Sequence, residues 1–366
     1  MTLSFRLYTE ETGWCDVTQV LEYESNAIVE LLEVVPPDRG AEWLKDSLQQ
    51  AIMVEIATIG PYASALWSIK ESNTAVAKAI REIIFDEMTH MGLVCNMLTT
   101  IGGTPVLADP KVVPKYEHGL PGGVRPGLIV FLEGLTKESV GMFSEIESPD
   151  HPVAEVNASA TIGDFYTAIG EVFETQQHLI SGARQIEHSL EAHGQGNKIL
   201  KLDSIEKVRA AIEVIKEQGE GTSASPENPF PGKPGELAHY YVFREMFRGK
   251  KLIKISENPV SWDFQGDDVP LPPAFPMARV PAGGWANGGP NAPAPAVQQV
   301  LGAFNTHFSD MLRALEAAWR TGDPATLTTA IGHMRGMRTE ARKLVQLELP
   351  DGSGKTYGPE FLYVEE

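Results

Sequence analysis

Two Glu-x-x-His pairs are the residues of this chain best suited to act together in chemistry: Glu87 with His90, and Glu236 with His239. This spacing places both side chains of a pair on one face of a helix, within reach of a common ion. Carboxylate and imidazole ligands suit Fe(II) or Mn(II) better than ions that prefer thiolates. Four-helix bundles that hold two such ions use two pairs of this kind and one further Glu from each of two other helices. The sequence therefore indicates a carboxylate-bridged di-metal centre.

The pattern of apolar residues places Glu55, Glu87 and His90 inside a hydrophobic core. Apolar side chains recur with a helical period over residues 41–70, with Glu55 in the middle of the stripe. A second stripe over residues 74–101 has Glu87 and His90 at its centre. An unpaired carboxylate there would cost several kcal/mol, so it must be protonated, paired or bound to metal. A buried Glu–His ion pair that only fixes the helix register is the alternative to a metal site.

The second pair, Glu236 and His239, lies in a shorter helical pattern. Pro234-Gly235 precedes it as a reasonable start signal, and an apolar helix face follows, so that the pair could point toward the core. Because this helix is shorter, the case for a simple ion pair is stronger here, although metal ligation is still the preferred interpretation. A single-metal centre on Glu55, Glu87 and His90 is a variant of the same hypothesis.

A symmetric centre needs a fourth carboxylate, and periodicity alone does not select it. Glu138 lies on one apolar stripe of the helical pattern at 128–147, and Glu147 lies on the neighbouring stripe. Glu171 lies on the polar side of the next long helical pattern, at 161–193. Each could be an ordinary exposed Glu, as most are. The residues leave Glu138 and Glu147 equally placed, with Glu171 behind them.

Pro61 lies inside the first of these helices, after Glu55. A proline there removes a backbone hydrogen bond and bends the helix, at a cost of about 3 kcal/mol. The bend could open room beside a metal for a substrate or dioxygen, or it could be a tolerated kink in a long helix. Tyr62 is a candidate wall of that cavity, although a core tyrosine with its hydroxyl paired is the simpler interpretation.

The composition is that of an ordinary globular enzyme. The chain has 366 residues, of which 42% are hydrophobic and 22% charged, and its formal net charge is −19. Such an acidic surface repels phosphate backbones and anionic membranes, so we expect neither nucleic acid nor membrane as a partner. With two cysteines, no signal-peptide pattern and no apolar span of about 20 residues, we expect a cytoplasmic protein without a disulfide framework.

Proline and glycine divide the chain into three parts. We expect an N-terminal extension at 1–40, a helical bundle with the metal site at 41–255, and a C-terminal part at 256–366. The last part begins with a Pro/Gly-rich, aromatic stretch, interpreted as a segment that wraps over the bundle, and ends in two helices joined at Gly322-Asp323-Pro324. The predicted fold is therefore all-α, a four-helix bundle with additional C-terminal helices and a long wrapping segment.

A set of short motifs runs from about residue 40 to the end of the chain. The motifs are Leu48–Tyr62, Asp86–Val94, Ile101–Pro105, Phe143–Pro149, Thr161–Tyr166, Glu236–Phe243, Ala330–Met334 and Gly358–Phe361. Together they resemble the ferritin-like domain of the iminophenyl-pyruvate dimer synthase family. The resemblance implies a ferritin-like bundle from bacterial secondary metabolism, where some members couple two imines derived from an aromatic amino acid. Because this chain looks like a stand-alone version, we do not extend the coupling activity to it.

The resemblance also implies a choice for the fourth carboxylate. The family's Ile-Glu-x-Pro element falls on Ile146-Glu147-Ser148-Pro149, which favours Glu147 over Glu138. The expected centre holds two irons, with manganese as another possibility. Its expected ligands are Glu55, Glu87, His90, Glu147, Glu236 and His239, with Glu138 kept as the alternative carboxylate.

The expected function is that of an O2-dependent non-haem di-iron oxidase or oxygenase. Its partners would be O2 and a small amino-acid-derived metabolite of bacterial secondary metabolism, and a homo-oligomer is possible. Two alternatives belong to other classes: an iron-binding or ferroxidase protein, and a metal-free helical protein that binds a partner. A resemblance of this kind indicates the fold more firmly than the chemistry.

Overall fold

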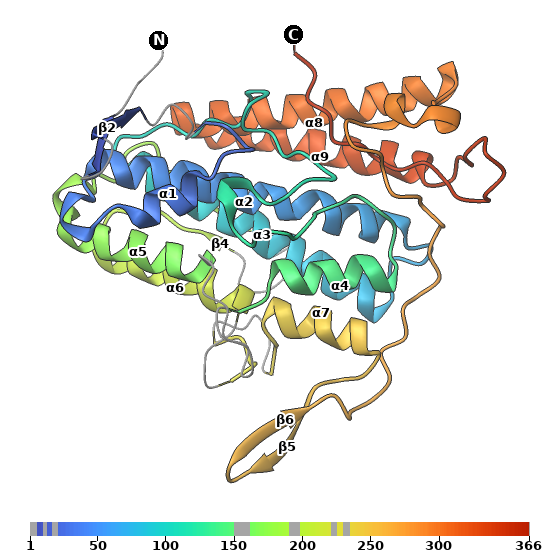
Figure 1. Ribbon diagram of the computed structural model, residues 1–366, viewed down its shortest axis with the longest axis horizontal. Helices are drawn as coiled ribbons and strands as arrows, with labels where there is room; N and C mark the ends of the chain where they lie inside the picture. Colours follow the sequence, from blue (N-terminus) through green and yellow to red (C-terminus); the bar gives the residue numbers. More distant parts are fainter. Residues whose placement is uncertain are drawn as a thin grey trace.

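The structure is a computed structural model, and it describes residues 6–9, 13–16, 21–149, 162–189, 198–220, 225–229 and 235–365. Within these ranges helices dominate and the strands are short (Figure 1), which confirms the predicted all-α class. The strands form two-stranded antiparallel ladders, β1 (Arg6–Thr9) with β2 (Gly13–Asp16), β3 (His188–Ser189) with β4 (Lys198–Ile199), and β5 (Ile253–Glu257) with β6 (Val260–Asp263). Short 3-10 turns are η1 (Pro36–Asp38), η2 (Pro121–Gly123), η3 (Gln177–Leu179), η4 (Trp285–Asn287) and η5 (Gly289–Asn291).

Two long helices, α2 (Ala41–Ser68) and α3 (Ala75–Thr100), form the centre of the molecule. Their bounds agree with the helices predicted at 41–70 and 74–101. The side chain of Thr74 caps α3 by accepting a hydrogen bond from the Ala77 N–H. Most residues of both helices are buried, because other elements cover them on both sides.

The other half of the bundle consists of four short helices rather than two long ones. One pair is α5 (Ile162–Thr175) with α6 (Ile205–Glu220), and the other is α4 (Lys137–Ile146) with α7 (His239–Arg248). Both pairs pack on α2 and α3, and they lie end to end below them in Figure 1. The two outer positions of the bundle are therefore broken near the middle, and helix ends meet at the break.

A C-terminal hairpin of two helices covers the opposite side of α2 and α3 (Figure 1). It consists of α8 (Pro295–Thr321) and α9 (Pro324–Leu344). Gly322 ends α8 in the left-handed conformation, with a φ of 75°, and the Asp323 side chain caps α9. The two predicted C-terminal helices are confirmed. The short helix α1 (Ala27–Glu33) packs near the start of α2.

The Pro/Gly-rich segment between α7 and α8 includes a hairpin and a buried anchor. The β5–β6 hairpin projects from the body in Figure 1. Further along, Trp285 is 1% exposed and its Nε1 donates to the Gly358 carbonyl at 2.8 Å. This contact joins the segment to the C-terminal part of the chain.

Two predicted helices are shorter than expected. At 128–147 only α4 is helical, because Thr136 and Ser139 form a capping box that starts the helix late, and Val130 pairs with His118 in an extended bridge. The helix predicted at 161–193 ends at residue 175, and the chain then turns back to α3, where the Ser181 N–H donates to the Thr100 carbonyl at 2.9 Å. Residues 161 and 190–193 of that prediction lie outside the described residues.

Pro61 does not interrupt α2. The missing N–H of a proline leaves the carbonyl one turn earlier, that of Ala57, without its helical partner. The Tyr116 hydroxyl donates to this carbonyl at 3.0 Å, and a side chain on Gly60 would overlap that hydroxyl. A side chain from outside the helix therefore satisfies the carbonyl that the proline frees.

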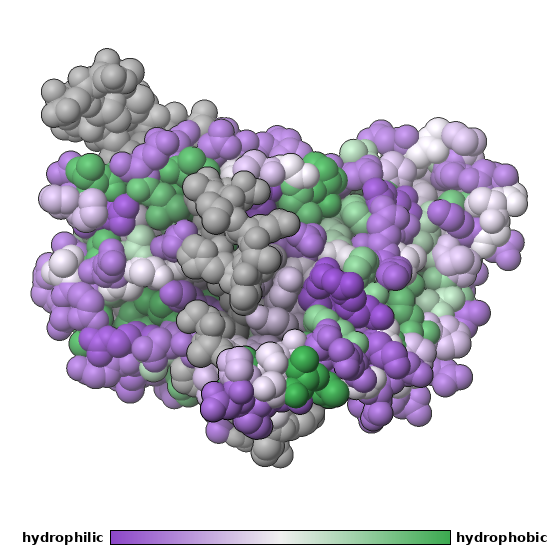
Figure 2. Space-filling view, turned by 60° about the horizontal axis from the view of Figure 1, so that its bottom comes forward, coloured by the Kyte–Doolittle hydropathy of each residue, from purple (hydrophilic) through white to green (hydrophobic). Residues whose placement is uncertain are grey.

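The molecular surface is mainly polar on the face that Figure 2 shows, with hydrophobic residues in small separate groups. Three large hydrophobic residues of the β5–β6 hairpin, Ile253, Ile255 and Val260, are 40–54% exposed. None of the described helices combines the length and the apolar composition needed to cross a bilayer.

Candidate metal centre

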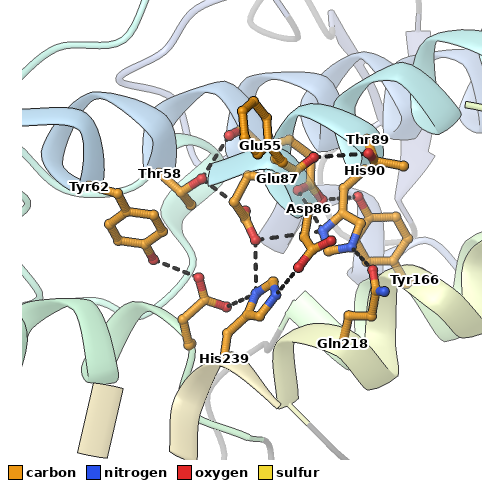
Figure 3. A network of polar contacts seen from close by, with 12 residues as sticks. Glu55, Thr58, Tyr62, Asp86, Glu87, Thr89, His90, Tyr166, Gln218 and His239 are labelled. Carbon is orange, nitrogen blue, oxygen red and sulfur yellow. Dashed lines mark hydrogen bonds and ion pairs between the residues drawn. The ribbon is translucent and has the colours of Figure 1, made fainter. Parts of the chain in front are cut away.

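The break in the outer helices brings five potential metal ligands together. Glu55 comes from α2, Glu87 and His90 come from α3, Glu147 follows the last residue of α4, and His239 is the first residue of α7. Their exposed fractions are only 2–8%. Figure 3 shows Glu55, Glu87, His90 and His239 pointing toward one another. Helix ends at the break thus place Glu147 and His239 opposite the two long helices.

The first group of ligand atoms comprises Glu55, Glu87 and His90. His90 Nδ1 lies 3.6 Å from Glu55 Oε2 and 3.6 Å from Glu87 Oε1. Ligand atoms about 2.1 Å from one ion lie about 3.0–3.4 Å from each other. The three side chains are therefore close to the separations that a shared ion requires.

The second group comprises Glu87, Glu147 and His239. His239 Nδ1 lies 3.0 Å from Glu87 Oε1 and 3.8 Å from Glu147 Oε2. The same Glu87 oxygen faces both histidines, whose ring centroids are 5.9 Å apart. This buried Glu/His cluster could hold a metal ion, and Glu87 belongs to both potential ligand groups.

The far nitrogen of each histidine has its own partner. Gln218 Oε1 of α6 lies 2.8 Å from His90 Nε2, and Asp86 Oδ2 of α3 lies 3.3 Å from His239 Nε2 (Figure 3). If each Nε2 carries the proton, the lone pair of each Nδ1 faces the carboxylates. Such partners orient imidazole ligands and raise their basicity.

One oxygen of each glutamate is held by a hydroxyl group. Thr58 donates to Glu87 Oε2 at 2.9 Å, and Tyr62 donates to Glu147 Oε1 at 2.6 Å. Tyr166 of α5 donates to Glu55 Oε1. The oxygen left on each glutamate is the one that faces a histidine. Three hydroxyl groups thus fix the orientation of the cluster.

Burial and mutual repulsion shift the pKa values in this cluster. Burial, and then the charge of Glu147, raise the pKa of Glu87 to about 7. Burial alone would lower the pKa of His90, but its hydrogen bond with Glu55 and the charge of Glu87 outweigh burial and raise the pKa to about 9. Burial opposes the charge of His239 too, yet Asp86, Glu147 and Glu87 raise its pKa well above the ordinary value. Without metal, protons neutralise the cluster, and a bound cation would replace them.

One buried nitrogen supports the fit to a metal directly. His239 Nδ1 has no hydrogen-bond partner, although two carboxylate oxygens lie within 4 Å of it. Buried polar atoms are rarely left without a partner, so this nitrogen calls for one. A divalent ion between it and the carboxylates satisfies all of them, which makes the residues present a good fit to metal.

A small cavity of about 40 Å³ lies next to the cluster. Its apolar walls come from Val54, Ile146, Ile162 and Ile215, and Lys216 of α6 lies at its side. A cavity of this size has room for a few molecules of the size of water. Tyr62 is not among the described lining residues; it is a buried core tyrosine whose hydroxyl is paired with Glu147, which is the simpler of the two interpretations.

Glu236 lies apart from both groups, contrary to the expected helix. The Asn228 N–H donates to the Glu236 carbonyl at 2.8 Å, and Leu237 pairs with Glu227 in an extended bridge. Because this backbone pairing keeps residues 236–238 extended, α7 begins only at His239. The prediction that Glu236 and His239 share one helix face is therefore wrong. The half-buried Glu236 belongs to neither potential ligand group.

The structure also separates the candidates for the fourth carboxylate. Glu138 lies in the first turn of α4, with its side chain 68% exposed and paired with Arg279. At 1.5 Å per residue it lies about 13 Å along the helix from Glu147, too far to share an ion. Glu171 is exposed on α5. Of the three, Glu147 alone joins a potential ligand group.

Sequence reasoning did not identify Asp86, Gln218 and Tyr166. Asp86 directly precedes Glu87, and a second acid beside a core glutamate was a signal that could have been used. Tyr166 lies in a motif quoted for the family resemblance, without an assigned role. No feature of the sequence indicated a role for Gln218 at the site, because nothing in the sequence shows that α6 packs next to His90.

Comparison with known proteins agrees with this architecture. Residues 48–248 match the model of a family described as ferritin-like, and this span contains every residue of both ligand groups. The solved structure of a ferritin-like protein from Caulobacter vibrioides shares 18% sequence identity with the chain, with a TM-score of 0.58, and the match covers 88% of this chain and 97% of that one. At this identity the likeness concerns the fold alone. Among curated proteins the chain has no match.

Proposed function

This chain belongs to the ferritin-like family, and from that premise we propose that it is an O2-dependent non-haem di-iron oxidase or oxygenase. The observation that carries the proposal is the Glu87 carboxylate oxygen shared by the His90 group and the His239 group. A carboxylate between two imidazoles is what a two-ion centre requires of its bridge.

Three residues would hold each ion. Glu55, Glu87 and His90 would bind the first, and Glu87, Glu147 and His239 would bind the second. When bound, iron would supply the redox chemistry with dioxygen that amino-acid side chains cannot provide. Three protein ligands per ion leave coordination positions for small molecules.

The surrounding residues position and shield this ligand set. Gln218 and Asp86 orient the two histidines, and the hydroxyl groups of Thr58, Tyr62 and Tyr166 orient the three glutamates. The apolar walls of the cavity keep bulk water from the cluster.

The proposed substrate is a small metabolite derived from an amino acid. Among the described residues that line the cavity, Lys216 is the only lysine or arginine, and its ammonium donates to Thr167 Oγ1 at 2.6 Å. A cation beside the apolar part of the wall, formed by Ile162 and Ile215, suits a carboxylate-bearing molecule. The resemblance to the iminophenyl-pyruvate dimer synthase family supports the same substrate class and a place in secondary metabolism.

A ferroxidase, for which iron itself is the substrate, is the second candidate. The volume of about 40 Å³ favours it, because ions, water and O2 fit there, whereas a larger metabolite requires the walls to move. Oxygen consumption separates the two candidates. A ferroxidase consumes O2 in proportion to added Fe(II), and an oxidase continues only when an organic substrate is supplied.

Metal analysis of the full chain, loaded with iron without oxygen, tests the centre itself. We expect about two irons per chain in the wild type, about one in His90→Ala or His239→Ala, and none or nearly none in Glu87→Ala. Glu138→Ala is the matched control, because this exposed glutamate lies outside the cluster and should leave both irons bound. A wild type without metal would refute the proposal, and one iron in both the wild type and His239→Ala would reduce it to a single-ion centre.

A further inference from the structure

Away from the bundle centre, we propose a second metal site between α8 and α9, formed by His307, Asp310 and His333 and suited to Zn²⁺. His307 Nδ1 and His333 Nδ1 lie 3.2 Å apart, and Asp310 Oδ2 lies 3.9 Å from His333 Nδ1. The site goes beyond the proposed function and does not depend on it.

The spacing of the two nitrogens matches zinc ligation. Imidazole nitrogens bind zinc at about 2.0–2.1 Å, so that two of them in tetrahedral geometry lie about 3.3–3.4 Å apart. The rings of His307 and His333 are tilted by 56° with centroids 5.5 Å apart, so the two nitrogens face one another from neighbouring helices. For an ion to bind between them, the two nitrogens would need to move apart only slightly.

Asp310 supplies the third ligand from the same face of α8 as His307. The three-residue spacing places both side chains on one helix face. Asp310 Oδ2 lies 3.9 Å from His333 Nδ1, and a modest rotation would bring it to an ion between the histidines. The other oxygen, Oδ1, accepts a hydrogen bond from Arg313 at 2.8 Å, which orients the carboxylate as an outer partner does in metal sites.

The surroundings hold the His307 ring against α9 and leave His333 accessible to water. Gly336 of α9 packs on the His307 ring, where a Cβ would lie 2.5 Å from Nε2. The His333 side chain is 25% exposed, so water can complete the coordination and the ion can enter. Two imidazoles and a carboxylate are borderline ligands of the kind that zinc accepts.

The site would cross-link the C-terminal hairpin. His307 and Asp310 belong to α8 and His333 belongs to α9, and these helices pack closely along their length. In Figure 1 the hairpin lies on the opposite side of α2 and α3 from α4 and α7, near which Glu147 and His239 lie. Zinc bound there would stabilise the hairpin without touching the bundle centre.

The proposal is tested by titrating the metal-free full chain with ZnCl2 and measuring the binding by calorimetry. The Glu87→Ala background removes the shared ligand of the bundle centre and should leave one zinc equivalent. When His307→Ala and His333→Ala are added to this background, the protein should no longer bind that zinc ion. Asp310→Asn should instead weaken zinc binding about tenfold or more. His178→Ala is the matched control, since this exposed histidine lies outside the site and its loss should change nothing.

The alternative is a simple hydrogen bond between the two imidazoles, and the test separates it from a metal site. His333→Gln keeps a hydrogen-bonding side chain, so it should preserve the unfolding midpoint of the metal-free protein and still lose the zinc equivalent. Substituting Co²⁺ should produce visible tetrahedral bands that disappear in the same variant. Equal zinc stoichiometry with and without His307 and His333, or full zinc binding by His333→Gln, would overturn the proposal.

Discussion

Replacing Glu87 with glutamine should stabilise the metal-free protein at alkaline pH while removing the proposed bridge between the metals. Glu87 is 3% exposed, and burial, followed by the charge of Glu147, raises its pKa from 4.5 to about 7. Glutamine has the same shape and can accept the hydrogen bond from Thr58. The substitution therefore removes a costly charge and keeps the packing.

The size of the effect follows from the pKa values. An acid with a raised pKa in the folded state binds its proton more tightly there, so stability falls as the pH rises from 4.5 to about 7, and the full cost persists above that. This difference corresponds to about 3 kcal/mol. His90, with a pKa of about 9, stabilises the fold below pH 6.5 and loses that contribution as the pH rises through 9. Because the charge of Glu87 supports the charges of both His90 and His239, the net gain for Glu87→Gln near pH 8.5 should be only about 1–3 kcal/mol.

Urea unfolding of chelator-treated protein at pH 5 and pH 8.5 measures this gain. The two proteins should nearly agree at pH 5, where Glu87 is mostly protonated, and the variant should unfold at higher urea at pH 8.5. Asp46→Asn is the matched control: burial, followed by the charge of Glu42, raises the Asp46 pKa to about 7, and this residue lies outside the ligand groups. The stability of Asp46→Asn relative to the wild type should change with pH in the same direction, and this variant should keep full metal binding.

The reasoning fails if Glu87→Gln unfolds at lower urea than the wild type at pH 8.5, since the buried charge would then stabilise the metal-free fold. A difference between the two proteins that does not grow from pH 5 to pH 8.5 would contradict the assigned pKa. Saturating metal should stabilise the wild type far more than the variant, which links the unfavourable charge to its ligand role.

Three further substitutions test other parts of the structure. Tyr116→Phe should destabilise the protein by about 1–3 kcal/mol in urea unfolding, because the Ala57 carbonyl beside the proline bend loses its donor; an unchanged midpoint would show that water replaces it. Asp86→Asn should weaken metal binding about 10–100-fold in a competition with a chelator, since the partner of His239 changes while the ligands stay; unaltered affinity would contradict its orienting role. Glu236→Ala should keep the metal content of the wild type in elemental analysis, and loss of an ion would restore Glu236 as a ligand.

The helical core was predictable because its signals are local. The apolar stripes of α2 and α3 repeat with the helical period over many turns, and both helices have the predicted bounds within two residues. The same stripes placed Glu55, Glu87 and His90 in the core, where all three are buried. Their first potential ligand group lies on two adjacent helices, so the sequence pattern was sufficient to propose it.

The predictions that were wrong depend on backbone pairing between distant segments. The pattern at 128–147 looked helical throughout, yet the capping box at Thr136 and the bridge between His118 and Val130 leave only its second half helical. Glu236 shows the expected spacing to His239, but hydrogen bonds to the segment at 226–228 keep it extended. Local periodicity carries no information on such partners.

By itself the sequence determined the all-α class, the two long central helices, the C-terminal hairpin and three buried residues of the candidate site, because these follow from residue periodicity and helix-end signals. Only the tertiary structure decided that the outer helices break where Glu147 and His239 meet the long pair, and that Gln218, Asp86 and three hydroxyl groups orient the cluster. The proximity of His307 and His333 likewise appears only once α8 packs on α9. The physical reason is that a site needs distances of a few ångströms between residues far apart in the chain, and packing of whole helices sets those distances.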